Sequence, residues 1–102
     1  MKNRIAGFDW DEGNKAKCQK HGVSIEEIEA ALANRTRVAP DLKHSDEEQR
    51  FIAVERNHSG RPMFIAFTFR ERKGQSLIRP VSARYMHKEE IEKYEKSSTT
   101  SH

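Results

Sequence analysis

The chain has 102 residues, a length that fits one domain with a single modest core. It carries 19 Lys and Arg against 16 Asp and Glu, and this net charge of +3 favours an anionic partner without reaching the charge of a nucleic-acid-coating tail. The single cysteine, Cys18, excludes an internal disulfide and a CxxC zinc site, and no apolar run has the length of a signal peptide or a membrane span. We therefore expect a cytoplasmic protein without contact to a membrane.

The N-terminal segment predicts a short strand and then a helix. Residues 8–10 place two aromatic side chains around an acid, which is typical of a short strand or an extended arm. Asp11 is a good N-cap for a helix that runs to about His21, and Gly22 can take the left-handed conformation that ends such a helix. Because a histidine at a helix end usually interacts with the last carbonyls, we interpret His21 as structural.

A second helix is predicted by a capping signal. Ser24 and Glu27 have the spacing of a capping box, which indicates an amphipathic helix from Ile25 to about Asn34. The apolar residues of this segment recur at helical spacing and form one core stripe, made of Ile25, Ile28, Ala31 and Leu32.

The remaining sequence predicts an antiparallel meander and a final helix. Strands are expected over residues 36–43, 50–56, 63–69 and 75–85, the helix over 87–96, and a disordered polar tail over 97–102. The run 63–69 is apolar almost throughout, which is typical of a central strand covered on both faces. The predicted fold is α+β, with the N-terminal helices packed on a four-stranded antiparallel sheet and a C-terminal helix, in one domain over residues 1–96.

The strand 75–85 is unusual because Arg79 and Arg84 interrupt its β-favouring residues. Strict alternation places these two arginines on opposite faces of the sheet. Pro80 cannot donate a ladder hydrogen bond, so we expect an edge position or a bulge near it. The arginines either pair with carboxylates or form an anion site.

The residue types favour one reaction class. The sequence has no metal-ligand constellation, no glycine-rich phosphate loop and no nucleophile elbow. RNA cleavage through the 2′-hydroxyl needs a proton carrier and cationic donors around the phosphate, and it needs no metal. The candidate proton carriers are His44 and Glu55, and the candidate phosphate ligands are Arg50, Arg79 and Arg84.

Several motifs, in order along nearly the whole chain, carry a family resemblance. They are Phe8-Asp9-Trp10-Asp11 with Asn14, Lys20-His21-Gly22-Val23-Ser24, His44-Ser45 with Glu48 and Arg50-Phe51-Ile52-Ala53, Gly60-Arg61, and Ile78-Arg79 with Ser82-Ala83-Arg84. Together they resemble the BrnT family of bacterial toxins. This resemblance implies a RelE-like α+β fold, a metal-independent ribonuclease activity that halts translation, and neutralisation by a BrnA-type antitoxin.

The resemblance also implies roles for individual residues. The catalytic residues would be Arg79, Arg84, His44 and Arg50. We further expect RNA contacts from Arg61, Arg70 and Lys20, and partner contacts from Trp10, Ile91 and Tyr94. No cofactor or metal is expected. The expected partners are RNA and a ribbon-helix-helix antitoxin, which binds the toxin in a hetero-oligomer and provides its sole link to DNA.

Alternatives to catalysis follow from the same residues. Arg50 and Arg84 can pair with Glu48 or Glu90 for structural reasons. A basic sheet face can also bind RNA or a partner protein without turnover, within a transcription-regulating complex. The catalytic hypothesis requires Arg79 and Arg84 to reach a common pocket, and it fails if each is held away from it by its own carboxylate.

Overall fold

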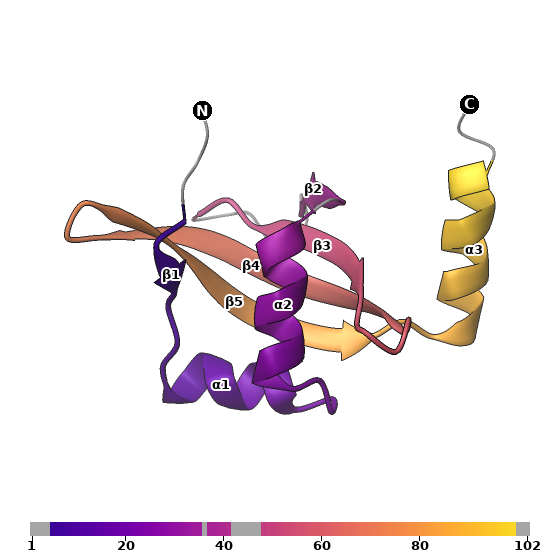
Figure 1. The fold of residues 1–102 in the computed structure, drawn as a ribbon, viewed down its shortest axis with the longest axis horizontal. Coiled ribbons are helices and arrows are strands. Elements are labelled where there is room, and N and C mark those ends of the chain that lie inside the picture. Colours follow the sequence, from indigo (N-terminus) through magenta and orange to yellow (C-terminus); the bar gives the residue numbers. More distant parts are fainter. Residues whose placement is uncertain (1–4, 36, 42–47, 100–102) are drawn as a thin grey trace.

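The computed structural model describes residues 5–35, 37–41 and 48–99. Within them the chain forms, in order, β1 (Gly7–Phe8), α1 (Glu12–Gln19), α2 (Ile25–Asn34), β2 (Val38–Pro40), β3 (Phe51–Arg56), β4 (Pro62–Arg72), β5 (Gln75–Tyr85) and α3 (Lys88–Thr99). The strands form one sheet in the order β1-β5-β4-β3-β2. Figure 1 shows α2 lying across one face of this sheet and α1 beside β5. The fold is α+β, as expected.

The predicted four-stranded antiparallel sheet is wrong in one respect. In the described part of the chain the sheet has five strands and is mixed, because β1 pairs in parallel with β5 through Gly7 and Leu77 and through Phe8 and Ile78. The pairings between β2, β3, β4 and β5 are antiparallel, as predicted. A strand of two residues has no periodicity that reveals its partner, so the sequence indicated β1 without its place in the sheet.

Capping boxes start both N-terminal helices. In α1 the Asp11 carboxylate accepts from the Asn14 N–H at 3.0 Å, and the Asn14 side chain accepts from the Asp11 N–H at 2.7 Å. Ser24 and Glu27 repeat this arrangement in α2, as predicted from their spacing. Gly22 has a φ of +93°, so the left-handed turn expected after α1 is confirmed.

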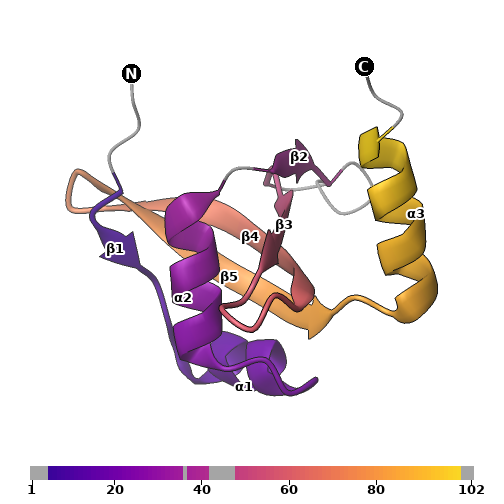
Figure 2. The same cartoon turned by 45° about the vertical axis from the view of Figure 1, so that its right-hand side comes forward.

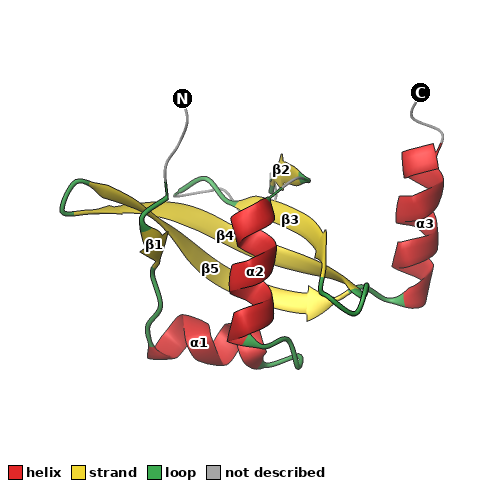
Figure 3. Cartoon of the chain, in the orientation of Figure 1, coloured by secondary structure: helices red, strands yellow, loops and turns green. Residues whose placement is uncertain are grey.

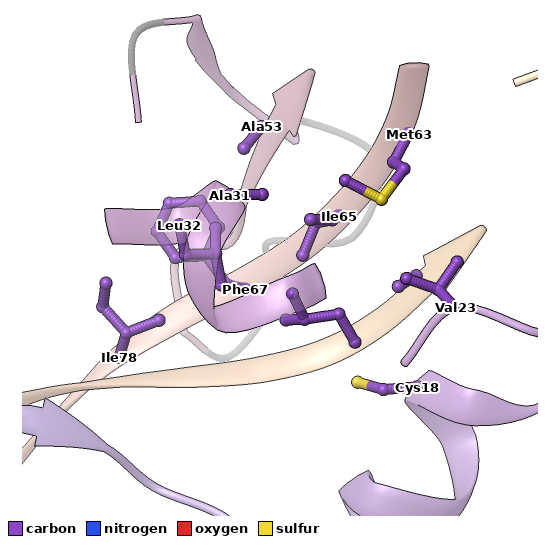
Figure 4. Packing of buried hydrophobic residues seen from close by; sticks show 11 residues of the cluster. Cys18, Val23, Ala31, Leu32, Ala53, Met63, Ile65, Phe67 and Ile78 are labelled. Atoms are coloured by element: carbon purple, nitrogen blue, oxygen red, sulfur yellow. The ribbon is translucent and has the colours of Figure 1, made fainter. Parts of the chain in front are cut away.

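The core lies between α2 and the sheet. Its largest side chains come from α2, β4 and β5, and Figure 4 shows them converging from these elements: Leu32, Met63, Ile65, Phe67 and Ile78. Cys18 joins this core from α1 and is fully buried, and this burial raises the pKa of its thiol to about 11. A thiol in this environment is a packing residue and a poor nucleophile.

A β-bulge divides β5 into two parts. The register with β4 pairs Ala66 with Ser82 but Phe67 with Pro80, which leaves Val81 as the extra residue. The irregularity expected near Pro80 is therefore confirmed. Because one added residue reverses the alternation, Arg79 and Arg84 share the face opposite α2, and their predicted placement on opposite faces is wrong.

Helix α3 stands apart from the two N-terminal helices, at the far end of the sheet (Figures 2 and 3). It is joined to the sheet by ion pairs from Arg84 to Glu90 at 2.9 Å and from Arg56 to Glu95 at 3.1 Å. The helix continues to Thr99, beyond its expected end at residue 96. None of the helices in the described residues has the length and apolar character needed to cross a membrane.

Replacing Asn14 with alanine is expected to destabilise the fold by roughly 2 kcal/mol, because the change leaves buried polar groups without partners. Asn14 is only 6% exposed, and its Nδ2 donates to the carbonyl oxygens of Asp9 at 3.0 Å and Pro80 at 2.8 Å. The bond to Pro80 fastens α1 to the bulged part of β5, and the bond to Asp9 holds the segment before the helix. Urea denaturation of the purified chain measures this decrease in the free energy of unfolding.

The matched control for this change is Gln19→Ala. Gln19 lies on the same helix and its exposed side chain donates to the Lys15 carbonyl at 3.2 Å. We expect the control to change the free energy of unfolding by less than about 0.5 kcal/mol. Equal losses in the two variants would contradict the role assigned to Asn14.

Candidate active site

The face of the sheet opposite α2, here called the outer face, carries the candidate site. Met63, Ile65 and Phe67 of β4 point into the core, so the alternate residues Phe64, Ala66 and Thr68 belong to the outer face. Among the described residues, two neighbouring hollows open on this face, and Lys17, Arg50 and Val81 line both. Their side chains come from α1, from the residue before β3 and from the bulge of β5.

The larger hollow has a volume of about 500 Å³. Its apolar lining is made of Ile52, Phe64, Ala66, Val81 and Ala83, and its polar lining of Lys17, His21, Asp41, Arg50, Ser82 and Arg84. An apolar surface bordered, among the described residues, by three cationic side chains, a histidine and one carboxylate suits a ligand with an apolar part and an anionic group.

The smaller hollow has a volume of about 360 Å³ and lies toward the β4–β5 hairpin. It is lined by Gly13, Asn14, Lys17, Glu48, Arg50, Thr68, Arg70, Arg79, Pro80 and Val81. Cationic side chains outnumber the one carboxylate among these described residues, so this hollow also favours an anion.

Arg84 is held at the larger hollow by α3. Its two terminal nitrogens donate to the two Glu90 oxygens, both at 2.9 Å, and its guanidinium lies 4.7 Å from the centre of the Phe64 ring. The hydrogen bond from Arg84, followed by that from the His87 N–H, lowers the pKa of Glu90 to about 2. Glu90 is therefore ionised at neutral pH and fixes the orientation of Arg84.

Arg79 is held at the smaller hollow by the segment before α1. It donates to the Asp11 carboxylate at 2.8 Å and forms a longer ion pair with Asp9 at 3.5 Å. The Asn14 N–H, and then the Arg79 guanidinium, lower the pKa of Asp11. The N-cap of α1 thereby also orients an arginine of β5.

The expectation that Arg79 and Arg84 reach a common pocket is wrong, so the catalytic hypothesis fails in the form that placed both arginines at one phosphate. Each pairs with its own carboxylates, and the two line different hollows. Their partners on β4 are Thr68 and Phe64, so roughly 13 Å of strand separates the two positions. The bulge brings both arginines to one face but leaves them at opposite ends of the candidate site.

The remaining predicted catalytic and RNA-contacting residues are only partly at the two hollows. Arg50 lines both hollows, and Arg70 lines the smaller one while pairing with Glu48 at 2.9 Å. Lys20 and Arg61 line neither hollow of the described structure. Arg61 lies on the helix side, 3.7 Å from the centre of the Tyr85 ring. His44 lies outside the described residues.

Glu55, the second candidate proton carrier, is also away from the hollows. It is on the same side of β3 as the buried Ala53, and its carboxylate accepts from the Arg37 N–H at 3.2 Å. This contact joins β3 to the start of β2 and gives Glu55 a structural role.

The residues expected to contact a partner are partly used within the chain. Trp10 packs against the core and donates from its indole N–H to Glu29 at 2.9 Å. Ile91 and Tyr94 on α3 are half-buried, and the Tyr94 hydroxyl accepts a hydrogen bond from Arg37. Their contacts with a partner stay a prediction.

The sequence interpretation missed Lys17, His21, Asp41 and Ser82 as lining residues of the larger hollow. Lys17 lies in the last turn of α1 and His21 in the turn that follows it. The helix expected from the sequence ran to about His21, and its i, i+4 spacing would have placed both side chains on one side and could have indicated a shared site. His21 follows the end of α1, and that end borders the larger hollow.

Comparison with known families identifies the chain. In the described residues, no group of three or more His, Cys, Asp or Glu side chains could hold a metal ion. The model of the ribonuclease toxin BrnT of type II toxin-antitoxin systems matches residues 10–90. The chain belongs to the BrnT family. A search of curated proteins found no significant match.

The BrnT match includes every residue that lines the two hollows, from Gly13 to Arg84. The resemblance inferred from the sequence motifs is therefore confirmed at the level of the family. As a member of the BrnT family, the protein is a ribonuclease toxin of a type II system, and such a toxin has an antitoxin as its partner.

Proposed function

We propose that this protein is a metal-independent endoribonuclease with a RelE-like fold, which acts in the cytoplasm, inhibits translation by cutting RNA and is neutralised by a BrnA-type ribbon-helix-helix antitoxin. The observation that carries the proposal is the larger hollow, where the cationic side chains of Lys17, Arg50 and Arg84 surround an apolar surface together with His21. The BrnT family match supports RNA as the substrate.

The proposed reaction uses the 2′-hydroxyl of the RNA itself. The 2′-oxygen attacks the adjacent phosphorus, the bond from phosphorus to the 5′-oxygen breaks, and the products carry a 2′,3′-cyclic phosphate and a 5′-hydroxyl. One proton must leave the 2′-hydroxyl and one must reach the 5′-oxygen, while negative charge grows on the phosphate. Arg50 and Lys17 would stabilise this charge, and His21 would carry a proton.

The carboxylate partner of Arg84 is compatible with a role at the phosphate. A guanidinium has several N–H donors in a planar fork, and a pair with Glu90 fixes its plane without using every donor. We therefore keep Arg84 in the proposed site as a preoriented phosphate ligand. Arg79, at the far end of the outer face, would contact RNA away from the bond that is cut.

The proposed function is tested with purified protein, a single-stranded RNA and excess EDTA. We expect cleavage to continue in EDTA, with cyclic phosphate ends on the products. The matched control is the same RNA with 2′-O-methyl groups at the cleavage sites, which should stay intact because the attacking oxygen is blocked. Loss of cleavage in EDTA, restored by added magnesium, would contradict a metal-independent reaction.

A second candidate function is a binding module without turnover. The ion pairs of Arg79 and Arg84 favour it, because these contacts also serve to hold α1 and α3 on the sheet. In that case the unmodified RNA would bind the protein and stay intact under every condition of the same assay.

A further inference from the structure

We propose that the smaller hollow is a second phosphate subsite, which holds the RNA phosphate that neighbours the one being cut. This inference rests on the proposed function and deepens it. It makes the substrate a single strand with at least two phosphodiester groups, extended along β4 and β5.

The charge of the smaller hollow favours a phosphate. Among the described residues it is lined by the cationic side chains of Lys17, Arg50, Arg70 and Arg79 and by a single carboxylate, Glu48. Asp9 and Asp11 neutralise part of the Arg79 charge from outside the hollow. A lining in which cationic side chains outnumber the carboxylate suits one phosphate group.

A polar atom without a partner supports the same ligand. The Nε of Arg70 is buried and makes no hydrogen bond within the described residues, while its terminal Nη2 donates to Glu48 at 2.9 Å. An unpaired buried N–H of a charged group is costly, so such groups usually meet an acceptor. The nearby Thr68 hydroxyl already donates to the Gln49 carbonyl at 2.7 Å, and a phosphate oxygen would supply the missing acceptor.

The position of the hollow relative to the proposed cleavage site fits a continuous strand. Lys17 and Arg50 line both hollows, so one set of cations separates the two subsites and can contact phosphates on either side. The outer face between Thr68 and Phe64 covers roughly 13 Å along β4, which is longer than one phosphate group requires. Proteins usually bind single-stranded RNA without base specificity through a positively charged groove that follows the sugar-phosphate backbone.

The test compares substrates of increasing length. One substrate is a dinucleotide with a single phosphodiester, and the others are trinucleotides with a second phosphate on the 5′ or the 3′ side of the cleaved bond. We expect the second phosphate on one side to raise kcat/KM by about tenfold, and a neutral methylphosphonate at that position to remove the gain.

The variant Arg70→Ala should lower the ratio of kcat/KM between the trinucleotide and the dinucleotide toward one. Arg56→Ala is the matched control, because Arg56 is a β3 arginine that pairs with Glu95 and lines neither hollow of the described structure, and its ratio should equal that of the unchanged protein. Circular dichroism of both variants serves to check that they are folded. Cleavage that does not depend on the second phosphate overturns the subsite and leaves the proposed function intact.

A binding measurement keeps the inference testable if no RNA is cut. Non-cleavable 2′-O-methyl oligonucleotides should bind more tightly when the second phosphate is present, and Arg70→Ala should remove this gain. Length-dependent binding without cleavage would overturn the proposed function and support the subsite. If length has no effect and Arg70→Ala weakens binding of the antitoxin instead, the hollow is part of the protein interface and the subsite is overturned.

Discussion

Replacing Arg50 with alanine is expected to lower kcat/KM for RNA cleavage by about 10²- to 10³-fold, the usual cost of removing one donor that stabilises developing charge. Arg50 lines both hollows and lies directly before β3, so its backbone is fixed by the sheet. Its carbonyl also accepts from the Asp41 N–H at 2.8 Å. The effect is measured with a fluorogenic oligoribonucleotide.

Two further variants make the Arg50 result specific. Arg50→Lys keeps the charge but loses the planar fork of donors. We expect its kcat/KM to lie between the values of the unchanged protein and of Arg50→Ala. Arg56→Ala removes the arginine at the opposite end of β3, which lines neither hollow in the described structure, and this variant should retain full activity. If Arg50→Ala and Arg56→Ala are equally active, the proposed phosphate site is wrong.

Replacing His21 with asparagine is expected to lower kcat by about 10²- to 10⁴-fold, the range for loss of a positioned acid or base. His21 lines the larger hollow together with Ser82 and Arg84, which come from β5. Within the described residues no hydrogen bond or ion pair occupies its ring, and the left-handed Gly22 turn fixes the chain next to it. The imidazole is therefore available to a substrate proton.

The pH profile separates a proton carrier from a structural residue. The plot of kcat against pH should have one limb fewer in His21→Asn than in the unchanged protein. If the substitution only weakened the fold, kcat would fall by the same factor at every pH. His58→Asn, in the β3–β4 loop, is the matched control and should leave the profile unchanged. His44→Asn is measured in parallel. If kcat falls further in His44→Asn than in His21→Asn, His44 is the proton carrier.

Local signals explain how much of the fold could be predicted. The bounds of α2 and β5 agree with the sequence, since a capping box marks the first and a turn at Lys73–Gly74 precedes the second. The partner of β1 and the site of the β5 bulge depend on contacts between distant segments, which a periodic pattern does not contain. The fold class was therefore predictable, and the topology of the sheet only in part.

The candidate site was less predictable than the fold, for the same reason. The pair between Arg84 and Glu90 joins residues six positions apart and was among the expected alternatives, and it is confirmed. Arg79 and Asp11 are 68 positions apart in the sequence, so no local spacing could predict their ion pair. His21 enters the larger hollow because α1 packs beside the bulged part of β5, and its neighbours in sequence give no sign of that contact.

The extra residue at Val81 allows β5 to contribute both to the core and to the outer face. Before it, β5 sends Ile78 into the interior, and after it the interior position passes to Ala83, while arginines emerge on the outside from both segments. One added residue thus reverses which face of the sheet each following side chain meets. The same eleven residues can therefore supply both buried apolar side chains and exposed arginines.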